Sequence, residues 1–241
     1  MDSTIKTHEI SSTKLVLLIF VPTTLVTGTY VVLGMMQTTI PSLLLFYLCA
    51  TAILFPLELG IILYASKKEY GKISLRSAFF DQMKLQWWKI LLYGSLLFAF
   101  AGLMSITVAP WEARLFVPMQ QNIPAYFDWN ALGQYPRTTV LITFAYYFLF
   151  NGFVGPITEE LFFRGYLTSR VSRFGKAAPL IITILFSLYH FWAPFGNIFR
   201  IAVFLPAAYA AFKLKNIYVS MVCHCLCNIF SVIIFITAIS A

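Results

Sequence analysis

Apolar residues fill most of this chain in long runs that charged residues interrupt only briefly. Runs of 18 or more apolar residues are typical of helices that cross a bilayer, because about 20 residues at 1.5 Å each span the hydrocarbon core. The pattern therefore predicts an all-α, polytopic transmembrane helix bundle with about seven spans. The predicted spans are residues 15–36, 41–65, 89–109, 138–168, 177–194, 197–212 and 216–240.

The spans divide into two groups within one expected structural domain. Residues 1–137 hold three spans, an inner amphipathic loop and an outer loop, and residues 138–241 hold a four-span core that carries the chemistry. Composition supports a lipid environment, since 60% of the residues are hydrophobic and only 11% are charged. Soluble domains carry about 25% charged residues.

The fourth span is predicted to break near its middle. Gly152 and Gly155 loosen a helix there, and Pro156 removes a backbone donor. A second helix is then expected to begin near Pro156. Glu159 and Glu160 would lie in its first turn, where the positive end of the helix dipole favours carboxylates.

The net charge of +8 indicates topology rather than nucleic-acid binding, because the bases are spread over several loops. Bases accumulate on the cytoplasmic side of membrane proteins. We therefore expect a multi-pass plasma-membrane protein with a cytoplasmic N-terminus. Three bases fall outside (Arg114, Arg137 and Arg200), and thirteen of the 17 fall inside: Lys6, Lys14, Lys67, Lys68, Lys72, Arg76, Lys84, Lys89, Arg170, Arg173, Lys176, Lys213 and Lys215.

Ionisable residues within spans are expensive in lipid, so they are candidates for function. Glu58 lies about ten residues from Lys68, and we interpret it as reaching toward the inner surface or pairing locally. The others lie in the predicted catalytic core. They are Glu159, Glu160, Arg164, His190 and His224.

Three pairs of polar or aromatic residues are spaced four apart, so each pair shares a helix face. At about 1.5 Å per residue they lie roughly 12–20 Å from the inner ends of their spans. We expect them to meet in one cavity in the inner half of the bilayer, opening toward the cytosol or laterally to lipid. The pairs are Glu160 with Arg164, Phe186 with His190, and His224 with Asn228.

These residue types suffice for attack of water on an amide. One glutamate can act as a general base, and Arg164 would keep one of the two adjacent carboxylates ionised and oriented. His190 can polarise the same water, while His224 and Asn228 can donate hydrogen bonds to a developing oxyanion. Alternatively, Glu159, His190 and His224 could form a three-ligand zinc site with one open position. The residues alone do not choose between these two mechanisms.

The motifs Glu159-Glu160-x-x-x-Arg164, Phe186-x-x-x-His190 and His224-x-x-x-Asn228 resemble those of the CAAX-protease and bacteriocin-processing membrane endopeptidases. The resemblance covers roughly residues 138–235 and has the same motif order on separate late spans. Members of that family are often described as intramembrane metalloproteases. The resemblance implies hydrolysis of a membrane-associated substrate, either a prenylated CAAX-type tail or a bacteriocin-related peptide.

The resemblance also implies a role for each motif residue. Glu159 would be the base that activates water, with help from His190. The oxyanion hole would consist of His224 and Asn228. Glu160 and Arg164 would have supporting roles, and Phe186 would pack beside the site.

Other functions remain as alternatives. A non-enzymatic bacteriocin-immunity or scaffold protein would keep the fold and bind a partner, and a proton-coupled carrier could use the same buried glutamate and histidines. The chain contains no HExxH helix, GxSxG elbow, Walker loop or GxGxxG sequence. Four further residues are interpreted structurally: Tyr189 and Trp192 as packing, and Asn197 and Arg200 as interfacial.

Overall fold

A computed structural model describes residues 9–36, 39–79, 82–120, 124 and 127–240, so the predicted inner base Lys6 lies outside it. Helices are the only regular structure in these described residues. The α-helices are α1 (Ser12–Met36), α2 (Ser42–Cys49), α3 (Phe55–Tyr70), α4 (Trp87–Gln120), α5 (Arg137–Leu149), α6 (Gly155–Glu159), α7 (Ala178–Leu188), α8 (Asn197–Leu214) and α9 (Tyr218–Ser240). Short 3-10 helices are η2 (Arg76–Ala78), η6 (Thr168–Arg170), η7 (Ser172–Ala177) and η8 (Pro194–Gly196).

The all-α, multi-pass architecture is confirmed. Six helical stretches of the described residues are long and apolar enough to cross a membrane. The predicted fifth span, 177–194, is shorter than expected because α7 ends at Leu188. Its 11 residues rise about 16 Å, roughly half of a bilayer's hydrocarbon core of about 30 Å.

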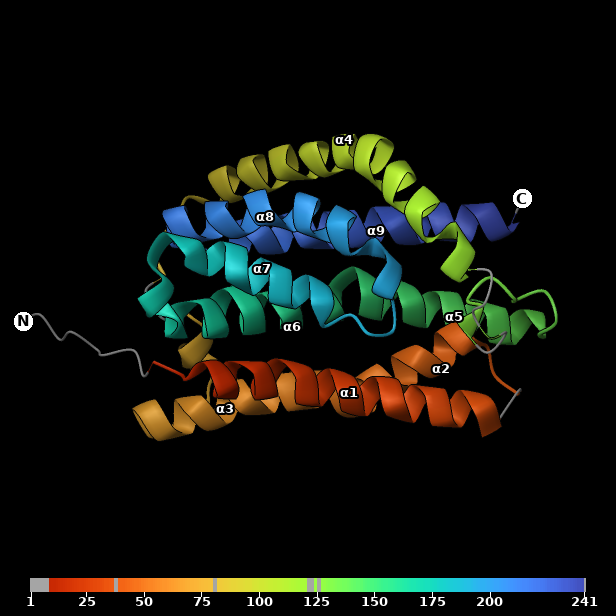
Figure 1. Ribbon diagram of the computed structural model, residues 1–241, viewed down its shortest axis with the longest axis horizontal. Coiled ribbons are helices and arrows are strands. Elements are labelled where there is room, and N and C mark those ends of the chain that lie inside the picture. Colours follow the sequence, from red (N-terminus) through yellow and green to blue (C-terminus); the bar gives the residue numbers. More distant parts are fainter. Residues whose placement is uncertain (1–8, 37–38, 80–81, 121–123, 125–126, 241) are drawn as a thin grey trace, which may run out of the picture.

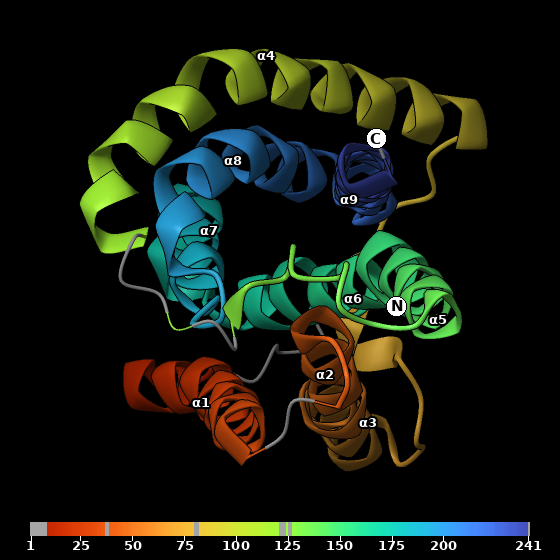
Figure 2. The ribbon, with the colours of Figure 1, turned by 90° about the vertical axis from the view of Figure 1, so that its right-hand side faces the viewer.

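The helices lie side by side along the long axis of the molecule, with the N- and C-terminal ends of the chain at opposite ends (Figure 1). Viewed end-on, α1 and α3 lie on one side, α5 and α6 in the middle, and α8 and α9 beyond them (Figure 2). The outermost helix is α4, which packs along α8 and α9 and bends over them. Pro110 and Pro118 lie inside this helix and account for the bend.

The distribution of side chains is opposite to that of a soluble protein. Large apolar side chains face outward, among them Ile106 at 74% exposed and Trp87 at 73%. Charged side chains such as those of Glu58 and Glu160 are fully buried. Lipid solvates the first group, and partners inside the bundle must satisfy the second.

The predicted break of the fourth span is wrong. Backbone angles stay right-handed helical at every junction from Arg137 to Arg170, and the helix widens into π turns instead of ending. No free helix end therefore exists at Pro156, and the expected dipole contribution to Glu159 is absent. The π-helical segments are η1 (Ala50–Leu54), η4 (Phe150–Val154) and η5 (Glu160–Leu167), and such segments are frequent at functional sites.

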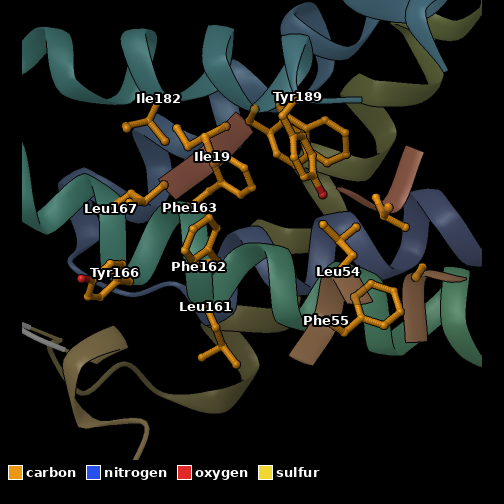
Figure 3. Packing of buried hydrophobic residues seen from close by; sticks show 14 of the residues in the cluster. Ile19, Leu54, Phe55, Leu161, Phe162, Phe163, Tyr166, Leu167, Ile182 and Tyr189 are labelled. Carbon is orange, nitrogen blue, oxygen red and sulfur yellow. The ribbon is translucent and has the colours of Figure 1, made fainter. Parts of the chain in front are cut away.

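Aromatic packing fixes η5 in the middle of the bundle. Phe162 and Phe163 are fully buried, and the ring of Phe163 packs edge-on against those of Phe186 and Tyr189. Figure 3 shows this cluster with Ile19 from α1 and Leu54 from η1 around it. The glutamates that precede Phe162 are thereby held at a defined depth.

The N-terminus of α8 is also fixed by a buried side chain. Both carboxylate oxygens of Glu112 on α4 accept backbone hydrogen bonds, from Ile198 at 2.8 Å and Phe199 at 2.7 Å. These two N–H groups would otherwise be orphan donors of the first helical turn. The contact holds the α7–α8 connection against the bend of α4.

Gly165 allows η5 to lie directly against η2. A Cβ at this position would clash with the backbone carbonyl of Ala78. We expect Gly165→Ala to lower the free energy of unfolding by about 1–3 kcal/mol, as overpacking of a well-filled core does. Denaturant unfolding in detergent micelles measures this, with Gly102→Ala as the control, since a Cβ at Gly102 meets nothing within 4 Å. Equal stability of the two variants would contradict the close approach.

Candidate active site

The structure brings the acidic motif and both histidines together. Glu159, the last residue of α6, places Oε1 3.8 Å from Nε2 of His190 and Oε2 3.5 Å from Nε2 of His224. Glu159 lies on the helix α6, His190 in the turn that follows α7, and His224 on the helix α9. Their side chains are 8%, 13% and 3% exposed respectively, so the group is almost sealed from the outside.

Hydrogen bonds at Nδ1 fix the orientation of both imidazole rings. His190 donates from Nδ1 to the carbonyl oxygen of Phe186 at 2.8 Å, since a carbonyl can only accept. His224 donates from Nδ1 to Oε1 of Glu160 at 2.9 Å. In each neutral ring Nε2 is then the acceptor nitrogen, and it faces Glu159. The two rings can therefore hold and accept protons beside this carboxylate.

Glu160 lies behind the reactive group and has a separate set of partners. Its carboxylate pairs with Arg164 at 3.3 Å and accepts a hydrogen bond from Ser220 at 2.6 Å. Together with His224, these contacts satisfy both carboxylate oxygens. Glu160 does not line the cavity in front of Glu159. Its position supports a role in orienting His224 rather than in contacting a substrate.

Arg164 is held by charge and by aromatic rings. Its guanidinium carbon lies 4.2 Å from the ring centroid of Phe186 and 5.7 Å from that of Phe204. No hydrogen bond of its guanidinium nitrogens is present among the described residues, so Glu160 is the carboxylate that compensates its buried charge. The four-residue spacing of Glu160 and Arg164 makes this pair possible.

Tyr189 is a site residue that the sequence analysis missed. Its hydroxyl donates a hydrogen bond to Oε1 of Glu159, although its ring also packs against Phe163 as expected. Adjacent residues on a helix point in different directions, so only one of Tyr189 and His190 was expected to face the site. Because α7 ends at Leu188, the turn that follows directs both side chains toward Glu159.

Asn228 lies in the cavity wall, but its amide is already bonded. Nδ2 donates to the backbone oxygen of Asn151 at 2.9 Å. Asn151, in the π segment η4, also accepts a hydrogen bond from the hydroxyl of Tyr47 at 2.8 Å. Asn228 can therefore donate to an oxyanion only by releasing or sharing this bond.

A cavity of about 200 Å³ lies in front of Glu159. Its lining extends from Glu159 and His224 past Asn151 to Phe46 and Trp129. Trp129 lies in the chain between α4 and α5. The expected opening of the cavity toward the cytosol or laterally to lipid stays a prediction.

One interpretation from the sequence is wrong, and a second is incomplete. Glu58 does not reach toward the inner surface: it is only 1% exposed, and its Oε2 atom has no hydrogen bond within the described part of the chain. Arg200 is not simply interfacial, because its side chain lines the cavity. It escaped notice because it lies near a predicted span end, where a base is unremarkable.

Glu159, His190 and His224 are also the residues that the sequence suggested as zinc ligands. Within the described residues, no group of three or more His, Cys, Asp or Glu side chains is arranged to hold a metal ion. Glu159, His190 and His224 are gathered, but they do not form such a ligand set. The zinc-dependent mechanism stays a prediction, and no step below uses a metal.

The fold and the site define a polytopic membrane protein with a glutamate–histidine centre inside its helix bundle. Residues 141–230 match the family described as Rce1-like, type II CAAX prenyl endopeptidase Rce1-like. All three motifs lie within the matched residues, so the match confirms the resemblance based on them. No curated protein and no solved structure matches the chain.

Proposed function

We propose that the chain is an intramembrane endopeptidase in which Glu159 activates a water molecule to hydrolyse a peptide bond. The observation that supports this most directly is the placement of two imidazole Nε2 atoms 3.5 and 3.8 Å from the Glu159 carboxylate, beside a cavity. The family match agrees with a protease. Neither the substrate nor the mechanism follows from that match.

The proposed reaction begins with a water molecule that donates one proton to Glu159 while its oxygen bonds to the carbonyl carbon. The second proton of the water faces the Nε2 acceptor of His190. Collapse of the tetrahedral intermediate breaks the C–N bond, and Glu159 returns its proton to the leaving amine. The second proton leaves the new carboxyl group through His190 for the amine, so the products are a carboxylate and a protonated amine, and no group remains attached to the enzyme.

Charge on the carbonyl oxygen is stabilised by donors on the other side of the cavity. His224 can donate from Nε2 only when both of its ring nitrogens carry protons, because Nδ1 is occupied by Glu160. Asn228 can donate when its bond to Asn151 is shared. This assignment follows the family resemblance, and removing one such donor typically lowers kcat by about 10²–10³-fold.

The substrate class and the cellular setting are part of the proposal. We propose a membrane-embedded peptide or protein substrate, either a prenylated CAAX-type tail or a bacteriocin-related peptide. The chain would lie in the plasma membrane with a cytoplasmic N-terminus, in agreement with the uneven distribution of basic residues among the predicted loops. The alternative is a non-enzymatic immunity or scaffold protein that binds without cleaving.

His190→Asn tests the catalytic assignment with little change in packing. The asparagine amide can still donate to the carbonyl of Phe186, as Nδ1 does, but it has no counterpart of Nε2. We expect kcat to fall by about 10²-fold, the lower range for a proton-transfer group. Cleavage of a membrane-anchored reporter peptide by purified protein, followed by mass spectrometry, gives the rates.

His190→Gln serves as the matched variant, since its amide reaches the Nε2 position but leaves Phe186 without its donor. Wild-type rates in His190→Asn would contradict the role of Nε2. In cells, full protection from a bacteriocin by the His190→Asn protein would instead favour the non-enzymatic immunity function. Metal analysis of the same preparations tests the zinc mechanism.

A further inference from the structure

A second, larger cavity adjoins the catalytic one. Its volume is about 950 Å³, within the range of about 300–1,000 Å³ that is common for ligand sites. The two cavities share the lining residues Trp129, Trp192, Ala193 and Arg200. The two cavities therefore adjoin at these four residues, and a chain lying across Glu159 would extend toward the larger one.

The larger cavity is mainly aromatic. Phe127, Phe191 and Phe195 add their rings to those of the two shared tryptophans. Such a lining suits apolar side chains, which gain little from lipid but much from close packing. Its single acidic residue, Asp128, has Oδ1 bonded to the backbone of Asn130.

Arg200 is the cationic group between the two cavities. Nη1 donates to the carbonyl of Ser187 at 3.1 Å and to Oδ1 of Asn197 at 3.0 Å, and Nη2 donates to the carbonyl of Ala193 at 3.1 Å. Nη1 also lies 3.4 Å from the hydroxyl of Ser187. All four acceptors are neutral, and no ion pair of Arg200 occurs within the described residues. Of the five guanidinium N–H groups, Nε–H and one N–H of Nη2 make no hydrogen bond to this described part of the chain.

A guanidinium that forms no direct ion pair among the described residues and has two free donors is suited to bind a carboxylate. Arginine presents its N–H groups in a planar fork that matches the two oxygens of such a group. Glu159 and Glu112 act on the charge of Arg200 from beyond ion-pair distance. In a medium of low dielectric, a carboxylate in direct contact gains more from this charge than it would in water. The substrate itself is the natural source of that carboxylate, because the site lies beside the scissile position.

We infer that this second cavity binds the substrate segment next to the cleaved bond, with apolar side chains on the aromatic wall and a substrate carboxylate on Arg200. The inference rests on the proposed function and specifies its substrate. The carboxylate can be the C-terminal one of a short tail or that of an acidic side chain. Both offer Arg200 the same chemistry, and the substrate peptides below distinguish them.

Matched peptides provide the test with the full-length protein in bilayer nanodiscs. One pair differs only in a free or amidated C-terminus, and the other in Glu or Gln after the scissile bond. For the wild-type enzyme, we expect loss of the recognised carboxylate from the peptide to raise KM by about 10–100-fold, which is the range for one hydrogen bond to a charged group. The kcat values for the two peptides should agree within about fivefold. The pair that shows the difference identifies the source of the carboxylate.

Arg200→Gln should remove the discrimination. We expect its KM for the carboxylate peptide to rise to that for the neutral peptide, so that the two differ by less than about threefold. Arg114→Gln, an exposed arginine on α4 that lines neither cavity, should leave both KM values unchanged. Arg200 also holds the α7–α8 connection, so the variant can fail to fold. In that case the comparison of peptides with the wild-type enzyme is itself the test.

Two results would overturn the inference. One is a wild-type enzyme that treats both members of both peptide pairs equally. The other is a folded Arg200→Gln variant that discriminates as well as wild type does. Failure of the proposed function looks different, because it would show as no cleavage of any peptide or as cleavage that survives loss of the Glu159 carboxylate.

Discussion

Glu159→Gln is expected to lower kcat for peptide cleavage by about 10³-fold. Glutamine has nearly the same shape, and its Oε1 can still accept the hydrogen bond from Tyr189. It cannot take a proton from water, so the step that a general base accelerates by about 10²–10⁴-fold loses its catalyst. Initial rates of purified protein at saturating peptide, in detergent or nanodiscs, measure the effect.

Glu58→Gln is the matched control for this change. Glu58 is another fully buried glutamate, but it does not line the cavity in front of Glu159. We expect its kcat to stay within about threefold of wild type, so that a loss of activity in Glu159→Gln reflects position rather than removal of a buried charge. Comparable rates for Glu159→Gln and wild type would rule out Glu159 as the base.

Glu160→Gln is expected to lower the free energy of unfolding by about 3–5 kcal/mol. This is the typical effect of removing one partner of a buried ion pair, which leaves the other charge uncompensated. Here that charge belongs to Arg164, whose side chain is 2% exposed and makes no hydrogen bond among the described residues. Unfolding by denaturant in micelles, compared with wild type, gives the difference.

The double variant Glu160→Gln with Arg164→Met supplies the control. Removing both charges should restore most of the lost stability, because a buried pair replaced by apolar groups is often neutral. Catalysis should remain impaired, since His224 then lacks a charged partner at Nδ1. If the two single substitutions were additive in a double-mutant cycle, Glu160 and Arg164 would not be coupled as described.

Spacing along helices predicted much of the candidate site. The separation of four residues placed Glu160 and Arg164 correctly on one helix face, where they form an ion pair. Phe186 and His190 also contact each other, but His190 lies beyond the end of α7 and not on a shared helix face. Similar depths in different spans predicted that Glu159 and the two histidines would lie close together, as they do. Their catalytic roles stay predictions. The expected boundary between residues 137 and 138 also stays untested.

Features that depend on where a helix deviates from regularity could not be predicted. Gly155 and Pro156 indicated a broken helix, whereas π turns absorb both residues without a break. The contact of Tyr189 with Glu159 depends on α7 ending at Leu188, one residue before Tyr189. Ser220 was recoverable, because it lies four residues before His224 on α9 and donates to the same carboxylate of Glu160.

The shortness of α7 has a consequence for the supply of the second reactant. Every peptide bond hydrolysed consumes one water molecule, which hydrocarbon does not provide. Because α7 ends about halfway across, the non-helical connection after Leu188 begins inside the bundle, where backbone polar groups are tolerated only against protein or in a hydrated cavity. Both cavities border this connection, at Trp192 and Ala193. The early end of α7 thus leaves room for solvent near a carboxylate that the helix bundle encloses.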